Sequence, residues 1–219
     1  MERKKTNRMK MMARPESLER YKMTVQLVRA CVKFYGIVDS DFLIRQIARL
    51  PEAENLILHD YIALIDSLVQ QDDKLLQQGP WLYSRLFCPS PEHLSDLLEE
   101  QICLPYRESS IESLLPYADD DYYEQTEEIE TLKAYLADHC VAADRLISIV
   151  GCGLRHASTD DVLTQRLADV DCSCLDMDKL RSLILAAEYV TRKVSLRGHT
   201  LQEEKALCDK WQSPDLILT

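Results

Sequence analysis

Apolar residues recur at helical intervals along most of this 219-residue chain, and that spacing limits the folds it can adopt. In residues 17–35 they alternate between three and four positions apart, which places them on one face of an α-helix. These residues are Leu18, Tyr21, Val25, Val28, Val32 and Tyr35. The whole chain has only 5 glycines, whereas sandwiches and barrels need many glycine-rich turns, so we expect a mainly α fold.

The N-terminal third has the element order of a winged helix. Gly36 ends the first helix, and Pro51 separates the next two, over residues 40–50 and 53–71. Two short apolar runs flank Gly79-Pro80 and predict one small β-hairpin within residues 73–84. Three helices followed by a hairpin predict a winged-helix-like domain over residues 17–85.

The remainder predicts an irregular helical bundle over residues 90–212, joined to the first domain by a linker at 86–90. Helix starts are indicated by Ser-Pro at residues 90–91, by Thr126, by the capping-box pair at 158/161 and by Thr200 with Glu203. Ile129, Leu132 and Leu136 form one predicted buried face. A longer helix is expected over residues 176–194, and the last from 200 to about 211. No repeat of fixed period occurs.

The net charge of −11 is unevenly distributed. Residues 1–14 carry six Lys and Arg against one Glu, a charge of +5, so the remaining residues carry −16. An acidic body repels nucleic acid and anionic membranes. We interpret residues 1–16 as a disordered basic tail. Under an alternative hypothesis the tail supplies phosphate contacts from Arg3, Lys4, Lys5, Arg8, Lys10 and Arg14.

The predicted third helix argues against DNA binding by the winged-helix unit. In such folds this helix enters the major groove and needs donors for phosphates and bases. Residues 53–71 contain no Lys or Arg and carry Glu54, Asp60 and Asp66, which would repel a duplex. A winged helix used as a protein-docking module fits this charge better, so we expect a protein partner.

Neither a membrane nor an oxidising compartment is indicated. No apolar run is long enough to span a bilayer, and no apolar signal segment follows the charged start. The 8 cysteines lie mostly in apolar helical patterns, so we expect buried reduced thiols and a cytoplasmic protein.

Neither a metal site nor an enzyme signature is predicted. Zinc could be bound by ligands from the set His139, Cys140, Cys152, His156, Cys172 and Cys174, but the sequence lacks a second close-spaced pair. We therefore predict no metal and no cofactor. Phosphate-binding loops, nucleophile elbows and zinc-protease motifs are absent, so we predict no catalytic residues and no enzyme. A small hydrolase using a cysteine with His139 or His156 stays as a third hypothesis.

An acidic, aromatic connector is the strongest candidate for an interaction surface. Tyrosines are favoured anchors at protein interfaces, and here they flank three aspartates. The candidate residues are Tyr117, Asp119, Asp120, Asp121, Tyr122 and Tyr123. The competing interpretation is that the tyrosines pack the connector onto the helices. We predict a non-enzymatic, adaptor-like protein; the alternative is a winged-helix nucleic-acid-binding regulator that uses the basic tail.

Three stretches, residues 28–38, 117–124 and 196–200, resemble segments of uncharacterised bacterial proteins with a winged-helix-like start and a helical body. Many of those proteins finish with a SEC-C zinc motif. In this chain Cys172-Ser173-Cys174 lacks the basic, glycine-containing continuation of that motif. The resemblance implies an adaptor-like bacterial protein and supplies no catalytic residues.

Overall fold

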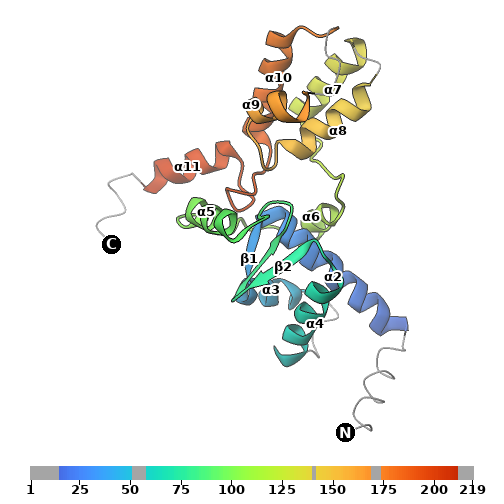
Figure 1. Cartoon of the computed structure of the whole chain (residues 1–219), viewed down its shortest axis with the longest axis vertical. Helices are drawn as coiled ribbons and strands as arrows, with labels where there is room; N and C mark the ends of the chain where they lie inside the picture. The colour runs from blue at the N-terminus through green and yellow to red at the C-terminus, as the bar shows by residue number, and fades with distance from the viewer. Residues whose placement is uncertain (1–14, 51–57, 140–141, 169–173, 212–219) are drawn as a thin grey trace.

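The computed structural model describes residues 15–50, 58–139, 142–168 and 174–211. These residues are mainly α-helical, with one small antiparallel sheet of three strands, which confirms the predicted fold class. A winged-helix unit lies at one end of the molecule and a helical bundle at the other (Figure 1). Within the described part of the chain, no helix has both the length and the apolar character needed to cross a membrane.

The winged-helix unit contains the predicted helices and hairpin together with one further strand. The hairpin turns at Gly79-Pro80, as predicted, and its second strand also pairs with a strand directly after the first helix, in the sheet order β1-β3-β2. This first strand is only three residues long, too short to show a periodicity in the sequence. The elements are α2 (Pro15–Tyr35), β1 (Ile37–Asp39), α3 (Ser40–Ile47), α4 (Leu58–Gln71), β2 (Leu75–Gln78) and β3 (Trp81–Ser84).

The core of this unit also uses residues beyond position 85. Leu114 and Tyr117, from α6 (Ile111–Leu114) and the 3₁₀ helix η2 (Leu115–Ala118), belong to the same buried cluster as the apolar face of α2. Leu94 of α5 (Pro91–Gln101) packs with Ile37 and Tyr83 of the sheet. Segments that follow the predicted linker therefore cover the winged helix.

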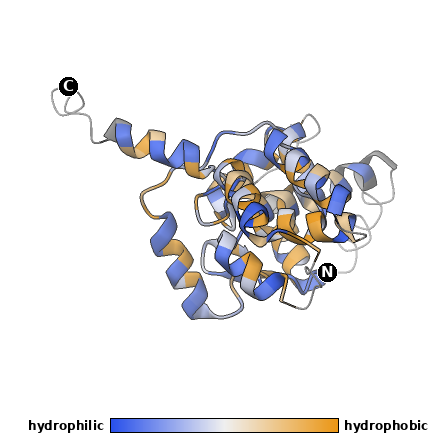
Figure 2. Cartoon of the chain, turned by 90° about the horizontal axis from the view of Figure 1, so that it is seen from above, coloured by the Kyte–Doolittle hydropathy of each residue, from blue (hydrophilic) through white to orange (hydrophobic). Residues whose placement is uncertain are grey.

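The bundle has a separate apolar core. The predicted face of Ile129, Leu132 and Leu136 is confirmed, since each is 2% exposed or less. The capping box of Ser158 and Asp161 is also confirmed. Figure 2 shows that the helices carry apolar stretches beside hydrophilic ones, as helices with one buried side do. The elements are α7 (Glu127–His139), α8 (Ala143–Gly153), α9 (Thr159–Asp161), the π-helix η3 (Val162–Arg166) and α10 (Met177–Val190).

A buried loop over residues 191–200 joins the two parts. The sequence predicted helix to residue 194, but α10 ends at Val190, and the hydroxyl of Thr191 donates to the carbonyl of Ala187 at 2.7 Å. The loop leads into α11 (Leu201–Trp211), which projects away from the body in Figures 1 and 2. The predicted start of this helix is confirmed, because Thr200 and Glu203 exchange backbone-to-side-chain hydrogen bonds of 3.1 Å.

Candidate functional site

The tyrosines of the predicted interaction surface hold the connector against both parts of the molecule. Tyr117 is only 2% exposed, and its ring packs edge-on to Phe34 at 4.7 Å and to Tyr122 at 4.9 Å. Tyr123 is half-buried and lies against the backbone of Gly151 in α8. The aromatic part of the connector thus contributes mainly to packing.

The aspartates of the connector divide into two kinds. Asp119 and Asp121 are exposed. Asp120 forms ion pairs of 2.5 Å with Lys33 of α2 and 2.6 Å with Lys74, next to β2. Hydrogen bonds from Lys33 and Lys74 lower the pKa of Asp120 from 3.8 to about 2, against a smaller opposing effect of burial.

These ion pairs line a cavity of about 590 Å³ between α2, the base of the hairpin and the connector. A third cation there, Arg29, pairs with Asp72 at 2.7 Å. Arg29 is neutralised by Asp72, whereas Lys33 and Lys74 share the single carboxylate of Asp120. A phosphate backbone would have to compete with these two carboxylates for the three cations.

We expect the Asp120→Asn variant to lose a pH-dependent part of the stability. Because the folded-state pKa is depressed, the contribution is complete above about pH 4 and is lost as the pH falls through 3.8 towards 2. The side chain is 50% exposed, and screening then limits the effect to about 1 kcal/mol or less. Urea unfolding of both proteins between pH 6 and about 2 measures it. Asp121→Asn is the control, and a difference that does not shrink on acidification would contradict the assignment.

The third helix of the winged-helix unit has the expected lack of cations. Among its described side chains, Ile62 is 46% exposed, and Asp66, Gln70 and Gln71 are exposed too. The tail residues of the nucleic-acid hypothesis lie outside the described residues, namely Arg3, Lys4, Lys5, Arg8, Lys10 and Arg14.

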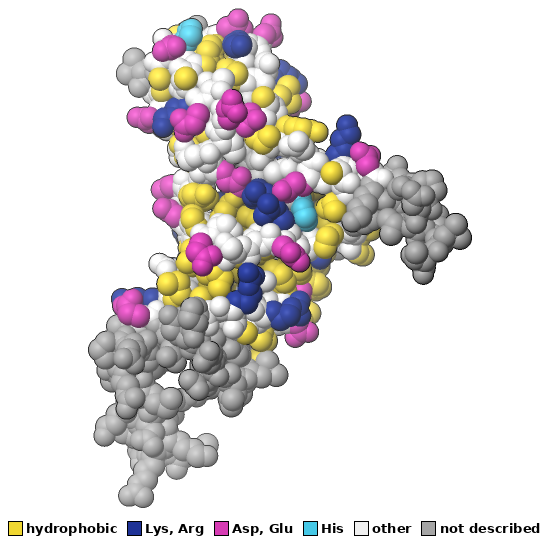
Figure 3. All heavy atoms as spheres, turned by 180° about the vertical axis from the view of Figure 1, so that it is seen from behind, with side chains coloured by type: hydrophobic (Ala, Val, Ile, Leu, Met, Phe, Trp, Pro, Cys, Tyr) yellow, Lys and Arg dark blue, Asp and Glu magenta, His cyan; other side chains and the backbone are white. Residues whose placement is uncertain are grey.

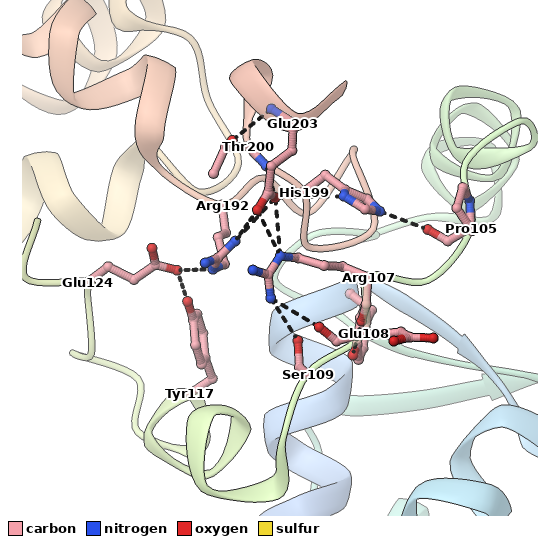
Figure 4. A network of polar contacts seen from close by, with 11 residues as sticks. Pro105, Arg107, Glu108, Ser109, Tyr117, Glu124, Arg192, His199, Thr200 and Glu203 are labelled. Atoms are coloured by element: carbon pink, nitrogen blue, oxygen red, sulfur yellow. Dashed lines mark hydrogen bonds and ion pairs between the residues drawn. The ribbon is translucent and has the colours of Figure 1, made fainter. Parts of the chain in front are cut away.

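A polar network connects the winged-helix unit, the bundle and α11 (Figure 4). Both carboxylate oxygens of Glu203 accept hydrogen bonds of 3.1 Å from Nε of Arg107, and Arg192 approaches the same carboxylate at 3.3 Å. Burial favours the neutral acid, but the amide of Thr200 and the two guanidinium groups outweigh it and lower the pKa of Glu203. This carboxylate stays ionised and ties three segments together.

A second carboxylate extends the network into the connector. Glu124 lies 3.2 Å from Nε of Arg192 and accepts a hydrogen bond from the hydroxyl of Tyr117 (Figure 4). Burial raises its pKa despite the nearby cations. On the other side, His199 donates from Nε2 to the carbonyl of Pro105 at 3.2 Å. Each group has a protein partner, so the arrangement serves to position the two parts.

Of the candidate cysteines and histidines, Cys152 and His156 each contact other groups of the described chain. Cys152 contacts carbonyls of the connector, whereas His156 accepts a hydrogen bond from Arg166 at 2.8 Å. Burial and neighbouring cations lower the pKa of His156 to about 4. Among the described residues, no group of three His, Cys, Asp or Glu side chains could hold a metal ion. Cys140 and Cys172 lie outside those residues.

One exposed apolar stripe was not singled out from the sequence. Met177, Leu185 and Tyr189 are 47%, 47% and 42% exposed, and their spacing of eight and four residues puts them on one face of α10. The sequence signal was present, since a helix with apolar residues on two faces cannot bury both in one small core. The other face holds the buried Leu180, Ile184 and Ala187.

Comparisons with known proteins identify no relative of this chain. No family model matches the chain. No curated protein and no solved structure is significantly similar to it. The resemblance to SEC-C-associated bacterial proteins therefore stays a prediction, and the function has to be argued from the surfaces described above.

Proposed function

We propose that this protein is a non-enzymatic adaptor that binds a protein partner through the exposed apolar face of α10. The observation that carries the proposal is the stripe of Met177, Leu185 and Tyr189, half of the large apolar side chains that are highly exposed among the described residues. Exposed apolar side chains gathered on one helix face are typical of docking sites, and tyrosine is a favoured interface anchor. Leu185 and Tyr189 are one turn apart, and the exposed Arg181 separates them from Met177.

The molecule's shape supports an adaptor role. Helix α10 and helix α4 lie at opposite ends of the molecule (Figure 1), and α4 exposes Ile62 beside Asp66. Two separated surfaces would allow two partners to be held at once. The polar network around Glu203 would fix the distance between them.

The alternative, nucleic-acid binding, is less well supported. On the face drawn in Figure 3, cationic and anionic side chains are interspersed, and no continuous basic strip is seen on its described part. Lys33 and Lys74, beside the hairpin, are engaged by Asp120. The alternative hypothesis places the phosphate contacts on the tail of residues 1–14, so under it a truncated chain starting at Pro15 should lose nucleic-acid binding.

The test is a pull-down from a bacterial lysate with the full chain, with and without nuclease. We expect a protein retained in stoichiometric amount after nuclease treatment by the wild type. The Leu185→Asp/Tyr189→Asp variant should retain at least about tenfold less of this partner protein, because an interface anchor contributes roughly 2 kcal/mol or more to binding. Ile102→Asp is the control, since Ile102 is 74% exposed and lies outside the stripe.

Two results would contradict the proposal. Equal retention by the wild type and the double variant would show that the stripe is not the docking face. Loss of all bound material on nuclease treatment, together with its loss on truncation of residues 1–14, would favour the nucleic-acid alternative. The double variant and the Ile102→Asp control change exposed residues only, so both should have almost the same thermal unfolding midpoint as the wild type.

A further inference from the structure

A second cavity, of about 750 Å³, is lined by arginines although the chain as a whole is acidic. It lies between α3 and the segment that connects α5 to α6. Arg45, Arg49 and Arg107 line it, and Glu108 is the one carboxylate among its described lining residues. Its volume is in the range of small-molecule sites. Arg107 is paired with Glu203, so the unpaired positive charge at this recess comes from Arg45 and Arg49, which repel one another unless an anion neutralises them.

Two of these arginines have no anionic partner among the described residues. Arg49 donates to the neutral oxygens of Gln46 and Ser109, at 2.7 and 3.1 Å. The guanidinium of Arg45 lies over the ring of Phe42, 5.9 Å from the centroid. No carboxylate in the described part of the chain lies within 4.0 Å of either arginine. Within the described part of the chain, neither guanidinium is held in an ion pair, and Glu112 interacts with Arg49 only at longer range.

The walls of the cavity are held in place before any ligand binds. Phe42 stacks on Tyr106 with ring centroids 3.9 Å apart. The guanidinium of Arg197 lies over the ring of Tyr106, 4.6 Å from its centroid. Arg107 is fixed by Glu203 and donates to the hydroxyl of Ser109 at 3.2 Å (Figure 4). A site that is already ordered spends little conformational entropy on binding.

We propose that this cavity, the α3 arginine pocket, binds the phosphate monoester group of a small phosphorylated molecule. Arg45 and Arg49 would contact the phosphate oxygens, because planar guanidinium groups match phosphate geometry. A phosphate monoester offers three acceptor oxygens, enough for hydrogen bonds from both arginines. This site is distinct from the α10 stripe and does not depend on the proposed adaptor role.

Calorimetric titration of the full chain with O-phosphoserine tests the proposal, with serine as the counterpart that lacks the phosphate group. We expect saturable binding of phosphoserine and none of serine. The Arg45→Gln/Arg49→Gln variant should bind at least about tenfold more weakly, as expected for loss of charge-assisted hydrogen bonds. The matched control is Arg145→Gln/Lys179→Gln, which removes the same charge from exposed residues of the bundle and should bind like the wild type.

A second measurement locates the site on the unaltered chain. Phosphoserine should shift the backbone amide resonances of Ser109 and Ser110 in nitrogen–proton correlation spectra. Equal weakening in the control variant would overturn the proposal, because it would indicate a general charge effect. So would unchanged Ser109 and Ser110 resonances at saturation. Binding of a short DNA duplex through Arg45 and Arg49, without binding of phosphoserine, would overturn it in favour of nucleic acid.

Discussion

Replacing Gly198 with alanine is expected to lower the free energy of unfolding by about 2–5 kcal/mol. Gly198 lies in the buried loop with a φ of +80°, a left-handed conformation that costs a residue with a side chain about 1–2 kcal/mol. A Cβ atom there would overlap the ring of Phe34 in α2, and relieving such an overlap costs typically 1–3 kcal/mol more. Urea unfolding followed by circular dichroism measures the loss.

Gly79 provides the matched control for this substitution. It also has a positive φ, of +59°, at the tip of the hairpin, but a Cβ there would meet no atom within 4 Å. Gly79→Ala should therefore cost only the backbone strain, about 1 kcal/mol. If the two variants were equally destabilised, the close approach of the buried loop (residues 191–200) to Phe34 would add nothing to the cost of the Gly198 substitution. The tight packing of this loop on α2 would then be contradicted.

The local part of this fold could be predicted from the sequence. The helix expected over residues 17–35 is observed as Pro15–Tyr35, because its apolar spacing and the following Gly36 are both local signals. The hairpin around Gly79-Pro80 is correct for the same reason. The ends of longer elements were less certain: α10 stops four residues early, where Thr191 and Val194 are buried by the winged-helix unit and the bundle together.

The long-range part could not be predicted. Arg107 and Glu203 are 96 residues apart in the chain, and no pattern in the sequence relates them. The same holds for β1, whose three residues become a strand only because β3 lies beside them. Tyr117 shows the consequence for the candidate site. The acidic, aromatic segment around Tyr117 suggests an interface. The tyrosine itself is nevertheless buried against Phe34, a residue that only the fold brings close to it.

The α3 arginine pocket illustrates the same limit for function. Arg45 and Arg49 are spaced as exposed cations on a helix, which is the ordinary solvated arrangement. Only the fold brings Arg107 and Ser109 opposite them. The α10 stripe, in contrast, could have been found by asking which apolar residues of a helix are left over once one face is buried.

Replacing Gln101 with leucine is expected to cost about 2–5 kcal/mol, because it removes the partner of several buried polar groups at once. The side chain is fully buried, and its amide nitrogen donates to the carbonyls of Tyr35 and Val194, both at 2.7 Å. Its oxygen accepts from Nε of Arg197 at 3.3 Å. Leucine fills a similar volume but leaves the carbonyl of Tyr35 without this donor, while the carbonyl of Val194 keeps only the amide of Arg197, at 3.2 Å. An unsatisfied buried group costs about 1–3 kcal/mol.

The position of these carbonyls makes the result informative about the whole molecule. Tyr35 ends α2 of the winged-helix unit, and Val194 belongs to the loop that follows the bundle, so Gln101 of α5 bridges the two parts. Gln78→Leu is the control, since Gln78 is exposed on β2 and its replacement should change stability by less than about 0.5 kcal/mol. Hydrogen exchange would show faster exchange of the Val194 amide in Gln101→Leu, because that amide donates to Arg155 in the same junction. If Gln101→Leu were as stable as the wild type, water would have to reach both carbonyls, and the junction would be more open than the structure indicates.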